Sequence, residues 1–218
     1  MIYPINEIFV TIQGEGSYSG TPSIFIRIQG CDVGCPWCDT RHTWELNQKI
    51  TFDSMLGKVE DSPQYANATL DDLYQYLKNS HIKHVVITGG EPAIYNLIPL
   101  GDIITQLGKT VQIETSGTYP LQIIDNIWVT LSPKINMPGG KEVLSSSLLR
   151  ANEIKMPVGK MDDIEKLKQL FIKHDLTNKK VFLQPLSANK SATKLCIAQA
   201  LENNWNLSIQ IHKYLDIR

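Results

Sequence analysis

The chain has 218 residues, of which 42% are hydrophobic and 20% are charged, so one domain can bury a substantial core. Its 21 basic and 22 acidic residues give a formal net charge of −1, which argues against a nucleic-acid or membrane-surface partner. No apolar run reaches the roughly 20 residues that span a bilayer, and the start lacks a secretory signal. We therefore expect a single domain over residues 1–218, in the cytoplasm.

Strand-like and helix-like segments alternate through most of the chain. After an apolar run at 7–12 that can add a short extra strand, strands are expected at 24–29, 84–88, 110–115, 128–132, 153–156, 181–184 and 208–212. Helices are expected at 70–79, 94–107, 161–174 and 192–203. This alternation is typical of parallel strands joined by crossover helices, so the predicted fold class is α/β.

The number of strands limits the architecture. About six or seven parallel strands are fewer than the eight of a full barrel, which usually takes about 250 residues. We therefore expect an incomplete, open (β/α) barrel. The irregular stretch 41–68 is expected to be an inserted small hairpin or irregular segment. Helix starts are predicted at a capping box of Thr69 with Asp72 and at a cap on Ser191.

Three cysteines lie within eight residues, with the spacing Cys-x3-Cys-x2-Cys: Cys31, Cys35 and Cys38. In a chain without an export signal, such a group predicts metal binding rather than disulfides. Three thiolates can hold three irons of a [4Fe-4S] cluster, whereas an electron-carrying cluster normally takes four cysteines. The fourth iron would stay open for a small molecule, and an open metal position is typical of a catalytic site. The remaining cysteine, Cys196, is expected to be buried in a helix.

His42 lies close to the cysteines in the sequence and leaves a zinc alternative open. Three cysteines and one histidine are a common ligand set for structural zinc. In that case the chain would be a zinc-stabilised binding module rather than an enzyme.

The strand at 24–29 carries an arginine on its less apolar face. Ile24, Ile26 and Ile28 share one face, and Arg27 lies on the other, because side chains alternate along a strand. If the isoleucines pack against helices, Arg27 points into the barrel. A buried guanidinium needs an anion, and its planar shape suits a carboxylate or phosphate of a ligand. The alternative is an internal ion pair, for example with Glu114.

Polar clusters follow several predicted strands. Gly89 and Gly90 allow a ligand to approach the backbone, and Glu91 offers a carboxylate to an ammonium group. Ligands collect at the carboxyl ends of barrel strands. We therefore expect a binding site built from 88–92, 114–118, 132–134, 184–185 and 210–213. The alternative for any single residue in these segments is that it only forms a turn and binds no ligand.

Two loops add further candidates. The segment Gln13-Gly14-Glu15-Gly16 can expose backbone groups to a ligand, or can be a simple turn. The hydroxyl of Thr40 is a hard oxygen ligand that suits Mg²⁺, although most loop hydroxyls cap a turn or face solvent.

The cysteine spacing after one strand, followed by Gly89-Gly90-Glu91-Pro92 after the next, resembles the radical S-adenosylmethionine (SAM) superfamily. Within it, the chain is similar to the 7-carboxy-7-deazaguanine synthase family, of the enterobacterial-like type. The similar segments span nearly the whole chain: EIFVTIQGEGSYSGTPSIFIRIQGC, CPWCDTRHTW, HVVITGGEP, QIETSGT, WVTLSPKINMPGG, ANEIKMPVG and IQIHKYL. A rival within the superfamily is an activase that installs a glycyl radical, but the chain has no second cysteine group for extra clusters.

The resemblance implies an open barrel of the radical SAM type in a homodimeric lyase. The reaction it implies converts 6-carboxy-5,6,7,8-tetrahydropterin to 7-carboxy-7-deazaguanine and ammonia, on the route to queuosine and other 7-deazapurines. A flavodoxin-type electron donor is expected by analogy. Because the cofactor supplies the radical chemistry, no side chain is expected to act as a nucleophile.

The resemblance also implies the site residues. A [4Fe-4S] cluster would be held by Cys31, Cys35 and Cys38, and S-adenosyl-L-methionine would bind its open iron. This cofactor would be contacted by Trp37, Cys38, Asp39, Gly90, Ser132, Pro133 and Lys134. The pterin would be contacted by Ile12, Gln13, Gly14, Arg27 and Thr88, and Mg²⁺ would be bound by Thr40. His212 and Lys213 are candidates for proton transfer or substrate contact.

Overall fold

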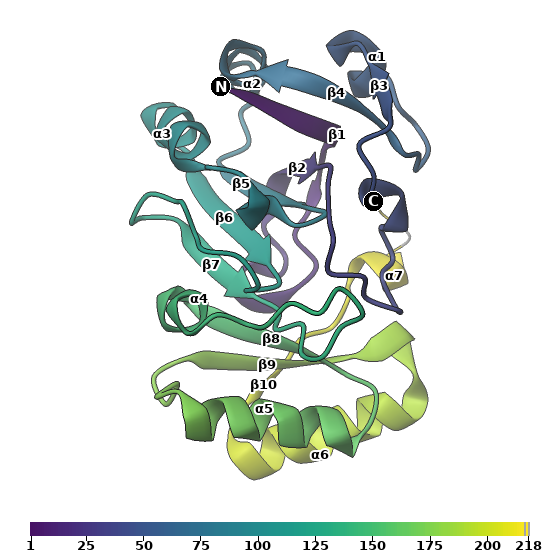
Figure 1. The fold of residues 1–218 in the computed structure, drawn as a ribbon, viewed down its shortest axis with the longest axis vertical. Helices are drawn as coiled ribbons and strands as arrows, with labels where there is room; N and C mark the ends of the chain where they lie inside the picture. Colours follow the sequence, from purple (N-terminus) through teal and green to yellow (C-terminus); the bar gives the residue numbers. More distant parts are fainter. Residues whose placement is uncertain (216, 218) are drawn as a thin grey trace.

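The computed structural model describes residues 1–215 and residue 217. In this part of the chain ten strands form one sheet, in the order β10-β9-β8-β7-β6-β5-β2-β1-β4-β3. The parallel strands in its centre are β2 (Pro22–Ile28), β5 (His84–Gly89), β6 (Thr110–Thr115), β7 (Trp128–Leu131), β8 (Glu153–Val158) and β9 (Lys180–Pro185). The sheet curves without closing on itself (Figure 1), which confirms the predicted open α/β barrel.

Helices connect these strands and cover the outer face of the sheet (Figure 1). They are α2 (Leu70–Lys78), α3 (Ile98–Gln106), α4 (Ser145–Arg150), α5 (Met161–Lys173) and α6 (Lys190–Asn203). Short 3₁₀ turns occur at η1 (Gly16–Tyr18), η2 (Arg41–Thr43), η3 (Pro92–Ile94) and η4 (Leu186–Ala188). The core lies between helices and sheet, and the three isoleucines of β2 are completely buried there, as predicted. Cys196 is buried in α6, also as predicted.

The helix starts confirm one cap and correct two expectations. The capping box of Thr69 with Asp72 is present at α2. The cap predicted on Ser191 is wrong, because Asn189 accepts from the backbone N–H of Ser191 and Ala192. The helix expected from residue 94 begins only at Ile98, because Pro99 then falls in the first turn, where a proline costs no helical hydrogen bond.

The N-terminal strand is longer than the extra strand expected at 7–12. β1 (Ile2–Ile12) runs antiparallel to β2, and its first residues pair with β4 (Gln64–Thr69). In the insert 41–68, β4 lies parallel to β3 (Gln48–Ile50). The hairpin expected for this insert is therefore wrong. The helix α1 (Phe52–Leu56) reverses the chain between the two strands, as a parallel pair requires.

The strand expected at 208–212 is also wrong. β10 (Asn206–Leu207) pairs with β9 and ends before this segment, which turns back toward the barrel and leads into α7 (His212–Leu215). Ser208 still donates its N–H to the Leu183 carbonyl of β9, but the polar groups that follow bond to the loop after β1. The backbone N–H of Ile211 donates to the carbonyl of Gly14 at 3.2 Å, and the Gln210 side chain donates to Glu15 at 3.0 Å.

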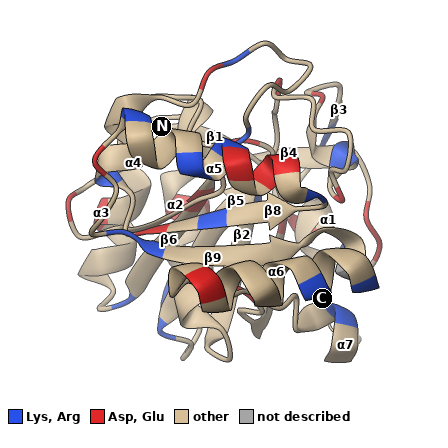
Figure 2. Ribbon diagram, turned by 90° about the horizontal axis from the view of Figure 1, so that it is seen from below, with Lys and Arg blue, Asp and Glu red and all other residues tan. Residues whose placement is uncertain are grey.

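Charged residues are interspersed along the ribbon (Figure 2), in agreement with the nearly neutral sequence. Some of them complete backbone hydrogen bonding at the amino ends of the strands. Arg150 donates to the carbonyl of Ile127 at 2.8 Å, and Lys179 donates to that of Ala151 at 2.7 Å. Within the described residues, no helix is long and apolar enough to span a membrane.

Candidate active site

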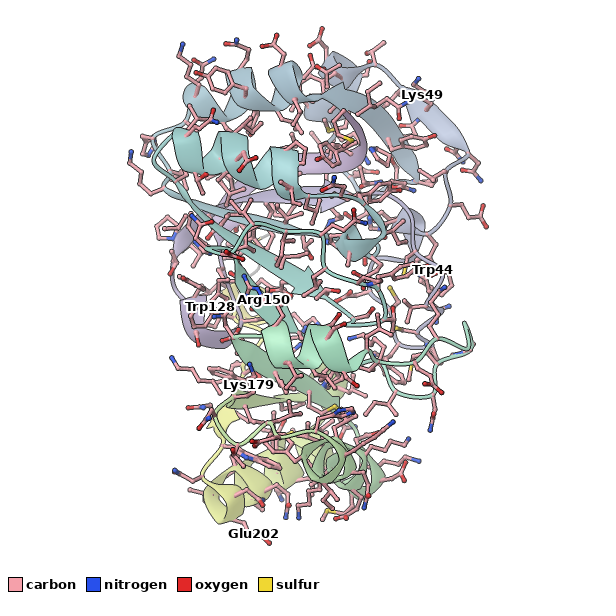
Figure 3. The ribbon with its side chains drawn as sticks, turned by 60° about the vertical axis from the view of Figure 1, so that its left-hand side comes forward. Trp44, Lys49, Trp128, Arg150, Lys179 and Glu202 are labelled. Atoms are coloured by element: carbon pink, nitrogen blue, oxygen red, sulfur yellow. The ribbon has the colours of Figure 1, made fainter. Side chains whose placement is uncertain are left out.

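A cavity of about 360 Å³ opens at the carboxyl ends of the parallel strands. Trp44 lines it, whereas Trp128, at the start of β7, projects on the opposite side of the molecule (Figure 3). Apart from Pro133, which lies between two lining residues, every site residue implied by the sequence lines this cavity. These residues are Ile12, Gln13, Gly14, Arg27, Cys31, Cys35, Trp37, Cys38, Asp39, Thr40, Thr88, Gly90, Ser132 and Lys134.

The loop that carries the cysteines is fixed to the end of β5 by backbone hydrogen bonds. The N–H of Gly90 donates to the carbonyl of Ile28, and the N–H of Glu91 donates to that of Gly30, both at 2.8 Å. A Cβ atom on Gly90 would lie 2.2 Å from the Gly30 oxygen, so only glycine allows this approach. The Gly-Gly segment therefore sets the distance between the cysteine loop and the second parallel strand.

All three cysteines of the loop are free thiols on the wall of the cavity. Burial raises the pKa of Cys31 to about 11, with a smaller contribution from the negative charge of Glu91. Burial also raises the pKa of Cys35. Three free thiols that face one cavity suit iron–sulfur ligation, which would release their protons because the thiolate is the ligand.

The zinc alternative with His42 does not fit this geometry. A tetrahedral zinc with bonds of about 2.3 Å to sulfur needs ligand atoms within about 4 Å of one another. Among the described residues, the donor atoms that lie within 4.8 Å of one another as a set belong to Glu7, His42 and Asp61. His42 is thus grouped with two carboxylates away from the cysteines, and it does not line the cavity.

Glu91 joins the ends of two strands. Its carboxylate accepts from the backbone N–H of Ala93 at 2.9 Å, from the Thr115 hydroxyl at 2.6 Å and from the backbone N–H of Ser116 at 2.7 Å. The sequence suggested an ammonium partner for this group. In the structure it is 1% exposed and holds the ends of β5 and β6 together.

Lys134 brings a positive charge to the cysteine side of the cavity. Its ammonium donates to the Ser132 hydroxyl at 2.6 Å and to the Ser132 carbonyl at 3.2 Å. Burial lowers the pKa of Lys134, although the nearby Cys35 and Glu91 act in the opposite direction. A negatively charged group bound among the cysteines would favour the ammonium form.

Arg27 also lines the cavity, and its partner is not the Glu114 considered from the sequence. Its Nε donates to Oε1 of Glu7 at 2.5 Å, and its guanidinium lies over the ring of Phe9, 5.5 Å from the centroid. Glu7 and Phe9 come from β1, whose pairing with β2 places Glu7 directly opposite Arg27. The prediction that Arg27 faces the barrel interior is confirmed. The internal ion pair considered as the alternative is also present, but its carboxylate is Glu7 and not Glu114.

The deep part of the cavity holds a lysine that sequence reasoning missed. Lys155 bonds to Glu114 at 2.7 Å and to Glu15. Burial alone disfavours the ammonium, but attraction to Glu114 and Glu15 raises the pKa of Lys155 well above its usual range. The signal was present in the strand 153–156, where Lys155 alternates with apolar residues and therefore faces the barrel interior.

Amide side chains continue this network. Gln13 donates to Glu114 at 3.0 Å, and Gln184 and Gln210 donate to Glu15. The cavity thus has a floor of two carboxylates, one ammonium and several amides. Such a floor suits a flat, polar ring that can both donate and accept hydrogen bonds.

Below this floor the barrel interior stays polar. Gln112 donates to the Thr130 hydroxyl at 2.8 Å, and its oxygen lies 3.0 Å from Nε2 of His84. The ring of Tyr18 stacks on that of His84 with centroids 4.2 Å apart and covers the amino end of the barrel. Burial lowers the pKa of His84, so this ring is neutral at neutral pH.

Comparison with known proteins decides the family. Residues 25–132 match the family model of the Radical SAM superfamily. The 7-carboxy-7-deazaguanine synthase of Escherichia coli K12 is 50% identical to this chain, with all of both chains covered. The chain belongs to the 7-carboxy-7-deazaguanine synthase family. The family member from Buchnera aphidicola is 47% identical over the full length of both chains.

A solved structure of a family member agrees with this fold. The crystal structure of QueE from Escherichia coli superposes with a TM-score of 0.93 at 49% identity, covering 96% of this chain and 94% of that one. The chain is therefore a radical SAM enzyme, and this membership implies a [4Fe-4S] cluster and S-adenosylmethionine. Full-length similarity to synthases counts against both the zinc module and the glycyl-radical activase.

Proposed function

We propose that this enzyme converts 6-carboxy-5,6,7,8-tetrahydropterin to 7-carboxy-7-deazaguanine and ammonia, in the biosynthesis of queuosine and other 7-deazapurines. The observation that carries the proposal is one cavity that joins two kinds of wall. Three free thiols make up the first kind, and Arg27 with the Glu15–Lys155–Glu114 network makes up the second. The first wall suits a cluster and its cofactor, and the second suits a polar ring that bears a carboxylate.

On the cofactor side, the cluster would be held by Cys31, Cys35 and Cys38. When bound, the cluster and S-adenosylmethionine supply the radical that removes a hydrogen atom from the substrate. Lys134 would lie near the carboxylate of the cofactor or the cluster sulfurs, whose negative charge would favour its ammonium form. The other residues proposed to contact the cofactor are Trp37, Cys38, Asp39, Gly90, Ser132 and Pro133.

On the substrate side, Arg27 would bind the carboxylate of the pterin. Within the described part of the chain, only its Nε is engaged by a protein group, so its two terminal nitrogens are available to the cavity. Glu15 and Glu114 would accept from the amino and ring N–H groups of the pterin, and Lys155 would balance their charge. The remaining proposed contacts are Ile12, Gln13, Gly14 and Thr88. By fixing both ends, this side restricts the geometry in which the ring can rearrange.

Thr40 is proposed as a ligand of Mg²⁺. It lines the cavity next to the cysteine loop, with its hydroxyl 3.6 Å from the sulfur of Cys38. A cation at this position could bind the substrate carboxylate from the side opposite to Arg27. Oxygen ligands and a substrate carboxylate are the combination that Mg²⁺ commonly uses.

Three further parts of the proposal concern the enzyme's setting. We infer a homodimer in the cytoplasm that receives electrons from a flavodoxin-type donor, in line with the family resemblance. Sedimentation analysis of the reconstituted enzyme at micromolar concentration tests the dimer. A single monomeric species would contradict it.

An anaerobic product assay tests the reaction. The reconstituted enzyme, supplied with S-adenosylmethionine, a reductant and the pterin, should form 5′-deoxyadenosine and 7-carboxy-7-deazaguanine. Cys35→Ala should lose iron and both products, whereas Cys196→Ala, which removes a buried sulfur far from the cavity, should keep its iron. Cleavage of the cofactor without a deazapurine would show that the substrate is a different one.

A further inference from the structure

Two residues of β1 contact the side chain of Arg27 from behind the cavity. Glu7 lies opposite Arg27 in the antiparallel register of β1 with β2, and its carboxylate accepts from Nε. The neighbouring cross-strand pair, Phe9 and Phe25, stacks with ring centroids 5.2 Å apart. The guanidinium lies over the Phe9 ring. A long, flexible side chain thereby loses most of its rotamer freedom before any ligand arrives.

The side chains of Glu7 and Arg27 differ in their exposure to solvent. The side chain of Glu7 is 3% exposed and does not line the cavity, whereas that of Arg27 is 18% exposed and does. Glu7 therefore contacts Arg27 from the protein side and leaves the opposite edge of the guanidinium facing the cavity. Two terminal N–H groups on that edge match the two oxygens of a carboxylate.

From this geometry we propose that Glu7 is a positioning residue, which orients Arg27 to bind the substrate carboxylate through both terminal nitrogens. The inference rests on the proposed role of Arg27. Glu7 does not line the cavity, and the role proposed for it is to select one orientation of the guanidinium. Binding at an enzyme site is sensitive to such orientation, since a displacement of 1 Å can cost roughly 100-fold in rate.

The charge of Glu7 has a second consequence. A buried carboxylate next to a guanidinium partly offsets its positive charge, so the affinity of Arg27 for an anion depends more on geometry than on excess charge. The neutral variant Glu7→Gln keeps an oxygen that can accept from Nε. It should therefore preserve the orientation of Arg27, whereas Glu7→Ala should lose it.

The test compares single and double variants of the reconstituted enzyme. Glu7→Ala should raise the KM for the pterin by about 10- to 100-fold, as expected for a displaced clamp. It should also increase the ratio of 5′-deoxyadenosine to deazaguanine, because a poorly held substrate lets the radical react elsewhere. Glu7→Gln should recover most of the loss in both quantities. Iron content and melting temperature, measured for each variant, show whether it is folded and loaded.

The double variant separates positioning from an independent effect. Once Arg27 is absent, Glu7 can no longer act through the guanidinium, so Arg27→Ala/Glu7→Ala should match Arg27→Ala alone in KM and in product ratio. Glu165→Ala, which removes an exposed glutamate on α5, is the matched control and should behave as the parent enzyme.

Each possible result either supports or contradicts the positioning role of Glu7. If Arg27→Ala raises KM but Glu7→Ala leaves KM and the product ratio unchanged, the positioning role is wrong and the clamp stands. A double variant much worse than Arg27→Ala alone also overturns it, because Glu7 would then act by another route. If Arg27→Ala itself leaves KM unchanged, the proposed clamp fails and the role of Glu7 fails with it.

Discussion

The role of a single residue in this enzyme depends on whether its side chain faces the cavity or the interior of the barrel. Thr40 and Arg27 lie on different elements, yet both line the cavity in which the carboxylate of the substrate is proposed to bind. His84 lies deeper, 3% exposed, with Nδ1 2.9 Å from the Thr110 hydroxyl and Nε2 near Gln112. The first two face the cavity, where we propose that they bind ligands, and the third is buried among polar groups of the barrel interior.

The hydroxyl of Thr40 gives a prediction about metal dependence. Thr40→Ala removes the proposed oxygen ligand, so the Mg²⁺ concentration for half-maximal activity should rise by about tenfold or more, while iron content stays unchanged. Thr40→Ser keeps the hydroxyl and serves as the control. A metal titration of Thr40→Ala that overlays the parent curve would remove this residue from the metal site.

The burial of His84 gives a prediction about pH. Because burial lowers its pKa in the folded state, the unfolded chain takes up a proton below about pH 6.5 that the folded chain does not. Its contribution to stability is therefore complete above pH 6.5 and is lost as the pH falls toward the folded pKa. The urea midpoint should fall between pH 7 and pH 5.5, and less so in His84→Gln.

A second histidine should also contribute to the loss of stability at low pH. Burial also lowers the pKa of His42, so some decline should remain in the variant. An equal decline in both proteins would mean that His84 does not cause it.

At the scale of elements, two buried amides, Gln29 and Asn6, add side-chain hydrogen bonds to the β1–β4 pairing that attaches the insert 41–68 to the barrel. Gln29 donates to the carbonyls of His42 at 2.9 Å and Glu45 at 2.7 Å, and accepts from Asn6 at 2.7 Å. Asn6 in turn donates to the carbonyl of Ser62 at 2.9 Å. Both ends of the insert are thus tied to β1 and to the end of β2.

Replacing the Gln29 amide should loosen the insert without removing the barrel. Gln29→Ala leaves two buried carbonyls without their donor, at a cost of about 1–3 kcal/mol in the free energy of unfolding. Hydrogen exchange should speed up selectively in 42–46 and 62–64. Gln75→Ala, on the exposed side of α2, should change neither. Uniform acceleration throughout the chain would contradict a local attachment.

Strands and helices could be predicted where the spacing of apolar residues reflects local backbone geometry. Contacts between residues far apart in the sequence could not be predicted. Both bounds of the strand 110–115 were predicted correctly, because apolar and polar residues alternate along it. Glu7 could not be assigned to Arg27, because that contact depends on the register of two strands joined by a long loop. The segment 208–212 has a strand-like sequence, but hydrogen bonds to Gly14 and Glu15 outweigh this propensity.

On the scale of the whole molecule, the loop after β1 and the C-terminal segment meet at the open side of the barrel. The loop 13–16 and the segment 208–212 bond to each other, with the N–H of Gly16 donating to the Ser208 hydroxyl at 3.2 Å. His212 lines the cavity at this junction. The gap in the open barrel is therefore covered by two irregular segments. A few polar contacts hold these segments together, in place of the hydrogen bonds between paired strands.

A methyl group at this junction should disturb substrate binding. In Gly14→Ala the new Cβ would lie 2.9 Å from Nδ1 and 3.2 Å from the backbone nitrogen of His212, so 210–215 must shift. The KM for the pterin should rise and hydrogen exchange in 208–215 should quicken. Gly57→Ala, whose Cβ meets only ordinary contacts at 3.7 Å, is the control. An unchanged KM would show that the junction tolerates movement.

The contact between Gly90 and Gly30 limits how this enzyme could be redesigned. Any larger side chain at position 90 would push the thiol-bearing loop away from its neighbour, as its Cβ would also come within 3.1 Å of Cys31. In a saturation library of cavity positions, this site should return only the parental codon among variants that retain their brown colour. Attempts to broaden the range of accepted heterocycles are therefore better directed at the proposed substrate side of the cavity.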